Sequence, residues 1–361
     1  MRSVRRILVF QTAFLGDVVL TLPLVQAIAD FFAHAEIDVV VVPRSADVCR
    51  NHPNIQSIIE YDKRGGDKGF AGYRNLLRRL RARSYDLAFV PHRSIRSATL
   101  TFLAGIPMRV GFTRSAGSFL FNKQVFYDKD VHEIERNISL LSGIGIHTLP
   151  FLLPTVHPSP EDKAAVDRIL KDVQLSKRSH QLIAFAPGTI WNTKRWLKDR
   201  FAQLAEMLSE DGYNIMLVGG KEDIELCDEI TAAASRTRVI NMAGTLSVLQ
   251  SAELIGKCSL LVSNDSAPMH LGVAMSTPVV AIFGATVPAF GFSPRGPLDI
   301  VVETRGLRCR PCSIHGGAKC PIETFDCMEN ISAERVYLRV LDVLQKSRRV
   351  GTSIRDKEAR L

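Results

Sequence analysis

The chain has 361 residues, of which 46% are hydrophobic and 23% charged, and its formal net charge is +9. This composition is ordinary for a soluble globular protein, and the length favours two domains because single hydrophobic cores stop growing at about 250–300 residues. No apolar run reaches the roughly 20 residues of a membrane-spanning helix, and the basic start lacks the apolar region of a signal peptide. We therefore expect a cytoplasmic protein with an acidic partner: nucleic acid, an anionic lipid surface or a phosphorylated substrate.

The first half of the chain alternates short apolar runs with helical periodicities. Apolar strands separated by helices are typical of parallel sheets with both faces covered. We predict one doubly wound α/β domain over residues 1–155. Its predicted strands are residues 7–10, 37–42, 58–61, 87–90 and 108–111, and its predicted helices are residues 17–33, 73–83, 94–104 and 132–142.

The second half repeats the alternation after a proline-containing linker, residues 156–180, in which a charged helix is predicted over 161–171. We predict a second doubly wound domain over 181–331, a helix over 332–347 and a basic, disordered tail over 348–361. Ligands of such sheets bind beyond the carboxyl ends of the strands, so two of these domains predict an interdomain cleft. The predicted strands are 182–185, 215–218, 260–262 and 279–283, and the predicted helices are 198–209, 222–234, 248–257 and 267–274.

Residues 260–272 predict an apolar strand that leads directly into a helix. Asp265 and Ser266 are preferred N-cap residues, and Pro268 suits a first helical turn, where its missing N–H costs nothing. The amides and the dipole at a helix N-terminus favour an anion, above all a phosphate. This segment therefore predicts a phosphate site.

A cation is expected beside that helix, because the dipole alone contributes only roughly 0.3–1 kcal/mol at an exposed end. Residues 186–196 follow another predicted strand and contain Thr189, Lys194 and Arg195. The two segments together predict a pocket for a nucleotide diphosphate.

Residues 11–23 follow the first predicted strand and contain a single glycine instead of the G-x-G-x-x-G of a dinucleotide binder. This argues against a Rossmann dehydrogenase. Gly16 lets the backbone approach a ligand closely, and a carboxylate at Asp17 is suited to accept a proton from an attacking hydroxyl. The alternative is that Asp17 only caps the helix that follows.

Three blocks of the chain together resemble a known family. They are Phe14-Leu15-Gly16-Asp17, Pro187-Gly188-Thr189 with Lys194-Arg195-Trp196, and Asn264-Asp265-Ser266 with Met269-His270. Their order and approximate spacing resemble the ADP-heptose:lipopolysaccharide heptosyltransferases, glycosyltransferase family 9, over nearly all of residues 4–345. The resemblance implies a GT-B fold of two Rossmann-like domains, with the sugar nucleotide held mainly by the C-terminal one. It also implies transfer with inversion that requires no metal or other cofactor.

The resemblance further implies roles for single residues and for the substrates. Asp17 is the expected general base. The expected donor is ADP-heptose and the expected acceptor is the inner core of lipopolysaccharide, met at the inner face of the inner membrane. Similarity around residues 189–196 favours the second heptosyl transfer over the first. The expected donor-binding set is Gly16, Thr189, Lys194, Arg195, Glu222, Gly244, Thr245, Asp265, Ser266, Ala267 and His270.

Some members of this set also have a simpler interpretation. His270, one turn into its helix, either approaches the phosphates or packs within the domain. Glu222 either reaches the ribose hydroxyls or caps the helix that begins there. Gly244 and Thr245 lie in a stretch that is expected to line the adenine pocket.

A basic set in the N-terminal half predicts the acceptor side, since inner-core sugar acids and lipid A phosphates are anionic. Each member alone is also explained as a solvated charge. His92, Arg93 and Arg96 are the stronger acceptor-binding candidates, because the segment 91–94 follows a predicted strand. The run His132-Glu133-x-x-Arg136-Asn137 is better explained by an internal ion pair on one helical face. The whole basic set is Arg44, Lys63, Arg64, Lys68, His92, Arg93, Arg96, Arg114 and Lys123.

Four cysteines, Cys309, Cys312, Cys320 and Cys327, lie in one segment that contains glycine and proline. Tetrahedral Zn²⁺ takes four thiolates, and the C-x-x-C spacing of the first pair is typical of a structural zinc site. The later spacings are less typical. Reduced free thiols are the alternative.

Two rival functions remain at the level of sequence. One is a related transferase that uses another nucleotide sugar to build a different surface polysaccharide. The other is a basic, zinc-containing nucleic-acid-binding protein, which the net charge and the cysteines suggest. The chain lacks the interleaved aromatic residues and the recognition helix typical of that class, so we expect no nucleic-acid partner.

Overall fold

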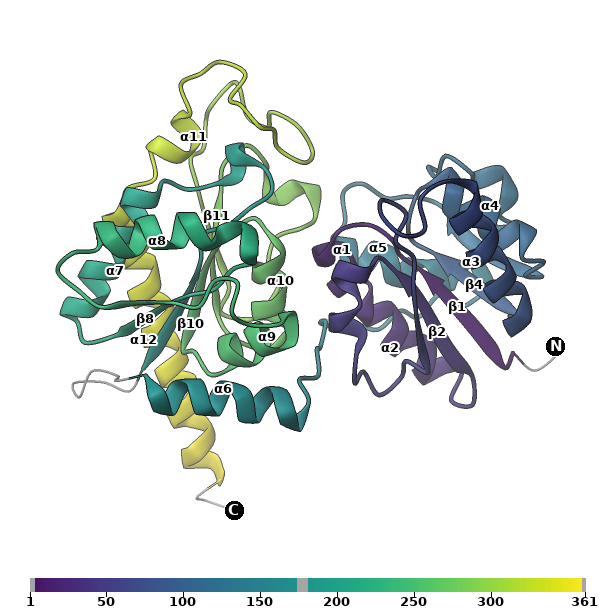
Figure 1. Ribbon diagram of the computed structural model, residues 1–361, viewed down its shortest axis with the longest axis horizontal. Helices are drawn as coiled ribbons and strands as arrows, with labels where there is room; N and C mark the ends of the chain where they lie inside the picture. Colours follow the sequence, from purple (N-terminus) through teal and green to yellow (C-terminus); the bar gives the residue numbers. More distant parts are fainter. Residues whose placement is uncertain (1–3, 174–180, 359–361) are drawn as a thin grey trace. The chain divides into compact units, whose positions relative to one another are not determined.

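The computed structural model describes residues 4–173 and 181–358 (Figure 1). The chain divides into two compact units, Met1–His157 and Pro158–Leu361. Of the predicted linker, residues 174–180 lie outside the described part, and residues 160–172 form the helix α6 (Pro160–Asp172).

The first unit is built on a six-stranded parallel sheet of order β3-β2-β1-β4-β5-β6. Val9 of β1 lies opposite Val39 of β2 and Phe89 of β4, so strands that are adjacent in the sheet are buried together. The chain reverses its direction of winding between β1 and β4, which makes this the topological switch point. The strands are β1 (Arg6–Phe10), β2 (Glu36–Val41), β3 (Ser57–Glu60), β4 (Leu87–Val90), β5 (Met108–Phe112) and β6 (Lys123–Val125).

Helices cover both faces of this sheet (Figure 1). The helices α3 (Gly69–Arg83) and α4 (Ile95–Leu103) pack on the face that carries Leu8 and Phe10. The opposite face is covered by α1 (Leu15–Val19), α2 (Leu22–Phe31) and α5 (Glu133–Ser139).

The single helix predicted over residues 17–33 is wrong, because two helices occupy this segment. The first ends at the C-cap Leu20, and the second has Thr21 as its N-cap with a proline, Pro23, in its first turn. Proline has no N–H with which to continue the hydrogen-bond ladder of the preceding helix, so a break is favoured there.

The second unit repeats the same topology with a six-stranded parallel sheet of order β12-β11-β10-β7-β8-β9. Its switch point lies between β7 and β10. The strands are β7 (Leu182–Ala186), β8 (Asn214–Leu217), β9 (Val239–Asn241), β10 (Leu260–Asn264), β11 (Val279–Phe283) and β12 (Ile300–Glu303).

One face of the second sheet is covered by α7 (Lys198–Glu210), α8 (Ile224–Ala233) and α12 (Ala333–Glu358). The core between them contains Trp196, Phe201 and Val340. On the other face, α10 (Ala267–Ala274) packs against α9 (Val248–Gly256), which α6 also contacts. The shorter helices of the chain are α11 (Asp326–Glu329), η1 (Pro43–Ser45), η2 (Asp47–Cys49), η3 (Ser118–Leu120), η4 (Leu140–Ile144), η5 (Asn192–Lys194), η6 (Lys221–Asp223) and η7 (Pro288–Phe290).

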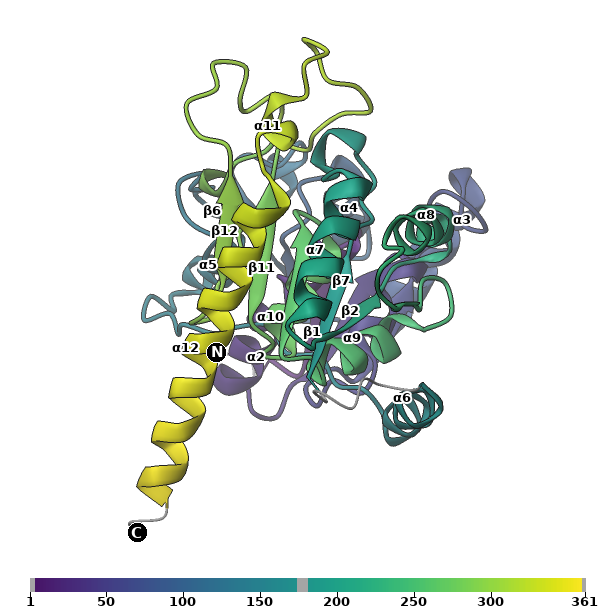
Figure 2. The same cartoon turned by 90° about the vertical axis from the view of Figure 1, so that its left-hand side faces the viewer.

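The predicted C-terminal end is wrong in one respect. The final helix continues to Glu358, so residues 348–358 are helical where a disordered tail was expected, and 359–361 lie outside the described part. Figure 2 shows α12 crossing its sheet and running on past the ends of the strands. Within the described ranges, every helix is too short or too polar to span a bilayer.

Candidate active site

The carboxyl edge of the second sheet joins the segments that follow β7 and β10. Asn264, at the end of β10, donates from Nδ2 to the Pro187 carbonyl (2.8 Å) and accepts the Trp196 amide at Oδ1 (3.0 Å). Its side chain is buried, and both of its polar atoms have a partner. One amide group therefore fixes the loop between residues 187 and 196 to the strand beside it.

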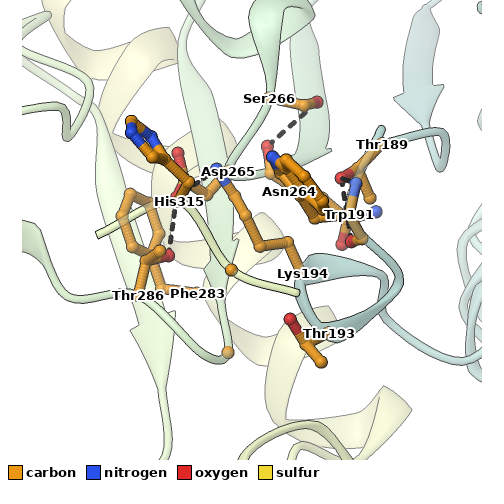
Figure 3. A network of polar contacts seen from close by, with 12 residues as sticks. Thr189, Trp191, Thr193, Lys194, Asn264, Asp265, Ser266, Phe283, Thr286 and His315 are labelled. Atoms are coloured by element: carbon orange, nitrogen blue, oxygen red, sulfur yellow. Dashed lines mark hydrogen bonds and ion pairs between the residues drawn. The ribbon is translucent and has the colours of Figure 1, made fainter. Parts of the chain in front are cut away.

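An ion pair occupies this edge (Figure 3). Lys194 Nζ lies 2.7 Å from Asp265 Oδ2, and Thr286 Oγ1 donates to the same oxygen at 2.6 Å. The two charged side chains are only 14% and 8% exposed. A lysine is thus held at a defined position just before α10, as the sequence predicted for the cation.

The N-cap of α10 is Ser266 alone, which corrects the expectation that Asp265 shares that role. Pro268 stands in the first turn as predicted. Ser266 Oγ donates to the Asn264 carbonyl (3.5 Å), and Asp265 is used by Lys194 and Thr286. The start of α10, from Ala267 onward, is therefore left to the helix amides and their dipole, which is the arrangement that binds anions.

Thr189 and Arg195 brace the loop in the described structure. Thr189 Oγ1 accepts the Trp191 amide (3.1 Å) and donates to the Trp191 carbonyl (3.2 Å). Arg195 Nη2 donates to the Thr189 carbonyl (3.0 Å). A phosphate bound by the Thr189 hydroxyl has to replace at least one of these local bonds.

A second loop, which sequence reasoning missed, lies against Lys194. Gly317 accepts the Thr193 amide (3.0 Å) at its carbonyl and donates its own amide to Thr193 Oγ1 (2.7 Å). Gly316 has φ +85°, and a Cβ added there would lie 2.9 Å from Lys194 Cγ. The adjacent glycines were the available sequence signal, because a positive φ and a close approach both favour glycine.

The loops after β8 and β9 also meet at this edge. The Gly244 amide donates to the Gly219 carbonyl (3.0 Å), and Thr245 Oγ1 donates to the Met242 carbonyl (2.7 Å). Glu222 lies in η6 and is exposed. The structure thus brings two predicted nucleotide segments together, with Glu222 on the solvent side.

Asp223, which sequence reasoning passed over, is more enclosed than Glu222. Its Oδ2 accepts the Gly220 amide (2.9 Å), and a Cβ added at Gly188 would lie 2.1 Å from its Oδ1. Burial raises the pKa of this carboxyl above its usual value, and Arg195 acts in the opposite direction. His270 is buried in α10.

The carboxyl edge of the first sheet carries Asp17 on the short helix α1. Asp17 Oδ2 accepts the Phe14 amide (3.1 Å), so the carboxylate does cap its helix, and the side chain is half-buried. Gly16 precedes it in the same turn. Capping and proton acceptance are compatible, because a carboxylate has two oxygens.

A polar cluster lies at the same edge, where β1 and β4 end. Lys63 Nζ donates to the Thr12 carbonyl (2.6 Å), and His92 Nδ1 lies 3.1 Å from Thr12 Oγ1 and 2.8 Å from Ser97 Oγ. Burial, Lys63 and Arg93 together lower the pKa of His92 to about 4. At neutral pH His92 is therefore an uncharged hydrogen-bonding group.

The other two acceptor-binding candidates pack on aromatic residues. The Arg93 guanidinium lies 4.3 Å from the Tyr127 ring centroid, a cation–π geometry. Arg96 Nη1 donates to Tyr61 Oη (3.1 Å). Both arginines are oriented by these contacts, but each contacts a different tyrosine.

The helix α5 supports the corner that carries Asp17. Asn137 Nδ2 donates to the Leu20 carbonyl (3.0 Å), and Thr21 Oγ1 donates to the Asp17 carbonyl (2.8 Å).

The predicted ion pair on α5 is confirmed, since Glu133 Oε2 lies 2.8 Å from Arg136 Nη1. Burial raises the pKa of Glu133, Arg136 lowers it and Asp17 raises it. The net result is a pKa of about 7.

The structure does not support the zinc site. All four cysteines lie within the described residues, and there no three His, Cys, Asp or Glu side chains are arranged to hold a metal ion. Cys309, Cys312, Cys320 and Cys327 are free thiols.

Two six-stranded parallel sheets of Rossmann topology, one in each unit, match the GT-B fold of a solved heptosyltransferase structure. Residues 73–317 match the profile of glycosyltransferase family 9 (heptosyltransferase). The chain belongs to this family. Membership makes it a glycosyltransferase and removes the rival interpretation of a nucleic-acid-binding protein.

Several known proteins are similar to this chain. Lipopolysaccharide heptosyltransferase 2 of Salmonella typhimurium is 30% identical over 297 residues, which cover 79% of this chain and 84% of that protein. The structure of Escherichia coli ADP-heptose LPS heptosyltransferase II has a TM-score of 0.78 at 25% identity, over 95% of this chain and 99% of that one. A family 9 glycosyl transferase from Veillonella parvula has a TM-score of 0.85 at 24% identity, over 95% and 98% of the two chains.

Proposed function

We propose that this protein transfers L-glycero-D-manno-heptose from ADP-heptose to the inner core of lipopolysaccharide, at the second heptose. The names and similarity of the Salmonella and Escherichia coli relatives support this function. The observation that carries it is the enclosed Lys194–Asp265–Thr286 network at the start of α10. This network combines a fixed cation with a helix N-terminus, which suits a diphosphate.

On the donor side, the diphosphate of ADP-heptose contacts Lys194, the first amides of α10 and the Thr189 hydroxyl. Negative charge grows on the diphosphate as the sugar leaves, so donors that are already oriented stabilise the transition state. These groups balance the charge without a metal ion in our proposal. Gly244 and Thr245 lie by the adenine, and Glu222 or the more enclosed Asp223 receives the ribose.

On the acceptor side, Asp17 is the general base. The acceptor hydroxyl oxygen forms a bond to the anomeric carbon, the bond from that carbon to the diphosphate oxygen breaks, and the hydroxyl proton passes to Asp17. One direct displacement inverts the anomeric configuration. His92, Arg93 and Arg96 bind the anionic inner core, and the enzyme works at the cytoplasmic face of the inner membrane.

Purified protein, ADP-heptose and two truncated lipopolysaccharides test this proposal. ADP release is expected with an acceptor that carries the first heptose, and much less with one that carries none. Lys194→Ala should bind the donor more weakly, while Lys198→Ala, which changes an exposed ion-pair lysine, should bind it like the wild type. ADP-heptose turnover only on the heptose-free acceptor would move the reaction to the first step. Turnover with another nucleotide sugar and none with ADP-heptose would replace the proposed donor.

A further inference from the structure

The charged side chains on the solvent-exposed face of α3 are all positive. This helix contains five arginines and no acidic residue. Leu76 and Leu80 face the core, whereas Arg74, Arg78 and Arg81 are exposed. By contrast, the exposed positions of α6 mix acidic and basic side chains. The charged residues of α3 are therefore all basic, unlike those of α6.

Exposed apolar side chains accompany these arginines. Tyr73 Oη donates to Thr99 Oγ1 (2.9 Å) and Arg81 Nε to the Leu103 carbonyl (3.0 Å), so α3 and α4 lie side by side (Figure 1). Phe70, in the first turn of α3, is 74% exposed, and Phe102 and Leu103 of α4 are 47% and 42% exposed. The six residues of what we name the α3–α4 surface are Phe70, Arg74, Arg78, Arg81, Phe102 and Leu103.

We propose that the α3–α4 surface docks on a lipid bilayer that contains anionic headgroups. Arginines at a membrane surface are attracted by anionic lipids, and aromatic and leucine side chains enter the interface between headgroups and acyl chains. Nucleic acid offers the charge but no apolar layer for Phe70, Phe102 and Leu103. The combination of both features on one surface therefore favours the bilayer.

Docking there would also serve catalysis. The helices α3 and α4 begin at the carboxyl edge of their sheet, where Lys63 and His92 lie. This edge would then be close to the headgroups, within reach of a lipid-anchored acceptor. This use rests on the proposed function, whereas the docking itself does not.

Vesicle co-sedimentation of the full chain tests the docking. The protein should bind phosphatidylcholine vesicles only when they contain phosphatidylglycerol, and added salt should weaken the binding. Arg74→Glu/Arg78→Glu should weaken binding by roughly 30-fold or more, since each arginine near the surface contributes about fivefold and the introduced glutamates are repelled by the anionic headgroups. Phe70→Ser should weaken binding by a smaller factor. Lys163→Glu/Lys171→Glu, which changes exposed charges of α6 by the same amount, should bind like the wild type.

Failure of the wild type to bind anionic vesicles would overturn the proposal, and so would equal losses in the two double variants. Tighter binding to an oligonucleotide than to vesicles, insensitive to Phe70→Ser, would assign the surface to nucleic acid instead. A delipidated inner-core acceptor separates docking from catalysis. Arg74→Glu/Arg78→Glu should keep wild-type turnover on it and lose turnover on acceptor embedded in vesicles. Absence of ADP-heptose turnover with normal vesicle binding would sink the proposed function and leave the docking intact.

Discussion

The two sheets have the same topology, yet their carboxyl edges are chemically different. In the first sheet, the segment after β1 is a short helix that presents a carboxylate, Asp17, which also accepts an amide of its own turn. In the second sheet, the segment after β7 is a long loop that presents a cation, Lys194, held by Asp265 at the end of the neighbouring strand β10. The shared topology thus determines where each site lies, and the segment that follows the strand determines the charge of the site.

The helix that follows β4 and the helix that follows β10 also differ, in how their N-termini are capped. Ser94, the N-cap of α4, accepts the Arg96 amide at its Oγ (3.2 Å). Ser266, the N-cap of α10, directs its Oγ to the Asn264 carbonyl. At the start of α4, the side chain of Ser94 accepts a helix amide. At the start of α10, the side chain of Ser266 accepts none, so the first amides of α10 suit an external anion. We take this difference as a division between acceptor activation and donor binding.

The sharpest way to break this division is Asp17→Asn. The amide oxygen can still accept the Phe14 amide, so the helix should persist, but the proposed proton acceptor is lost. We expect turnover to fall by about 10²–10⁴-fold with donor affinity unchanged. Steady-state rates and calorimetric titration with ADP-heptose measure both, with Asp30→Asn on α2 as a control. A variant that still turns over but no longer binds donor would reverse the assignment of the two edges.

A single variant and a double variant test the carboxyl edge of the second sheet. Lys194→Ala should lower donor affinity by about 10–100-fold, because a charge-assisted bond contributes roughly 1.5–3 kcal/mol. It should also destabilise the fold by about 3–5 kcal/mol, since Asp265 keeps a buried charge without its partner.

Lys194→Ala/Asp265→Ala should recover much of that stability without recovering affinity. Urea denaturation and titration with ADP follow the two effects separately. Recovery of donor affinity in the double variant would mean that Lys194 acts only as the partner of Asp265.

Glu133 sharpens the comparison, because it is a second, buried carboxyl that interacts electrostatically with Asp17 at the first edge. Its pKa rises from 4.5 to about 7 on folding. The folded state therefore binds more protons between these values, and stability should fall by on the order of 3 kcal/mol as pH rises from 4.5 to 7. Glu133→Gln should flatten this slope in urea denaturation at pH 5 and pH 8, and Glu135→Gln should leave it. An unchanged slope would remove Glu133 as its cause.

The smallest expected effect concerns the support of Asp17. Thr21 Oγ1 donates to the Asp17 carbonyl and accepts from Gln11 Nε2 at 3.2 Å. Thr21→Val should cost about 1–3 kcal/mol of stability and lower kcat by a few-fold. Thr231→Val, which removes a bond within α8, is the matched control. Equal kcat values for the two variants would show that the corner does not position Asp17.

Much of the fold was predictable from local pattern. The strands β4 and β11 and the helix α10 were predicted with their observed bounds, because each is a continuous apolar or N-capped run. The edge strands β6, β9 and β12 were missed, since they are short and contain polar residues. Their identity depends on neighbours in the sheet rather than on their own sequence.

The candidate site was predictable in its residue types but not in its pairings. Asp265 was expected as a cap, and it pairs instead with Lys194 and Thr286, which are distant in the sequence. Asp223 was overlooked beside Glu222 because only the fold encloses it against Gly188. The cysteine spacing suggested zinc, and the loop geometry does not bring three ligands together. Long-range packing decides each of these outcomes.

The most direct test of the division between the two edges is a crystal structure of the protein with ADP. The account predicts the diphosphate within hydrogen-bonding distance of Lys194 Nζ and of the first amides of α10, at the carboxyl edge of the second sheet. A diphosphate bound by Lys63 and His92 at the edge of the first sheet, with Lys194 still paired only to Asp265, would contradict it.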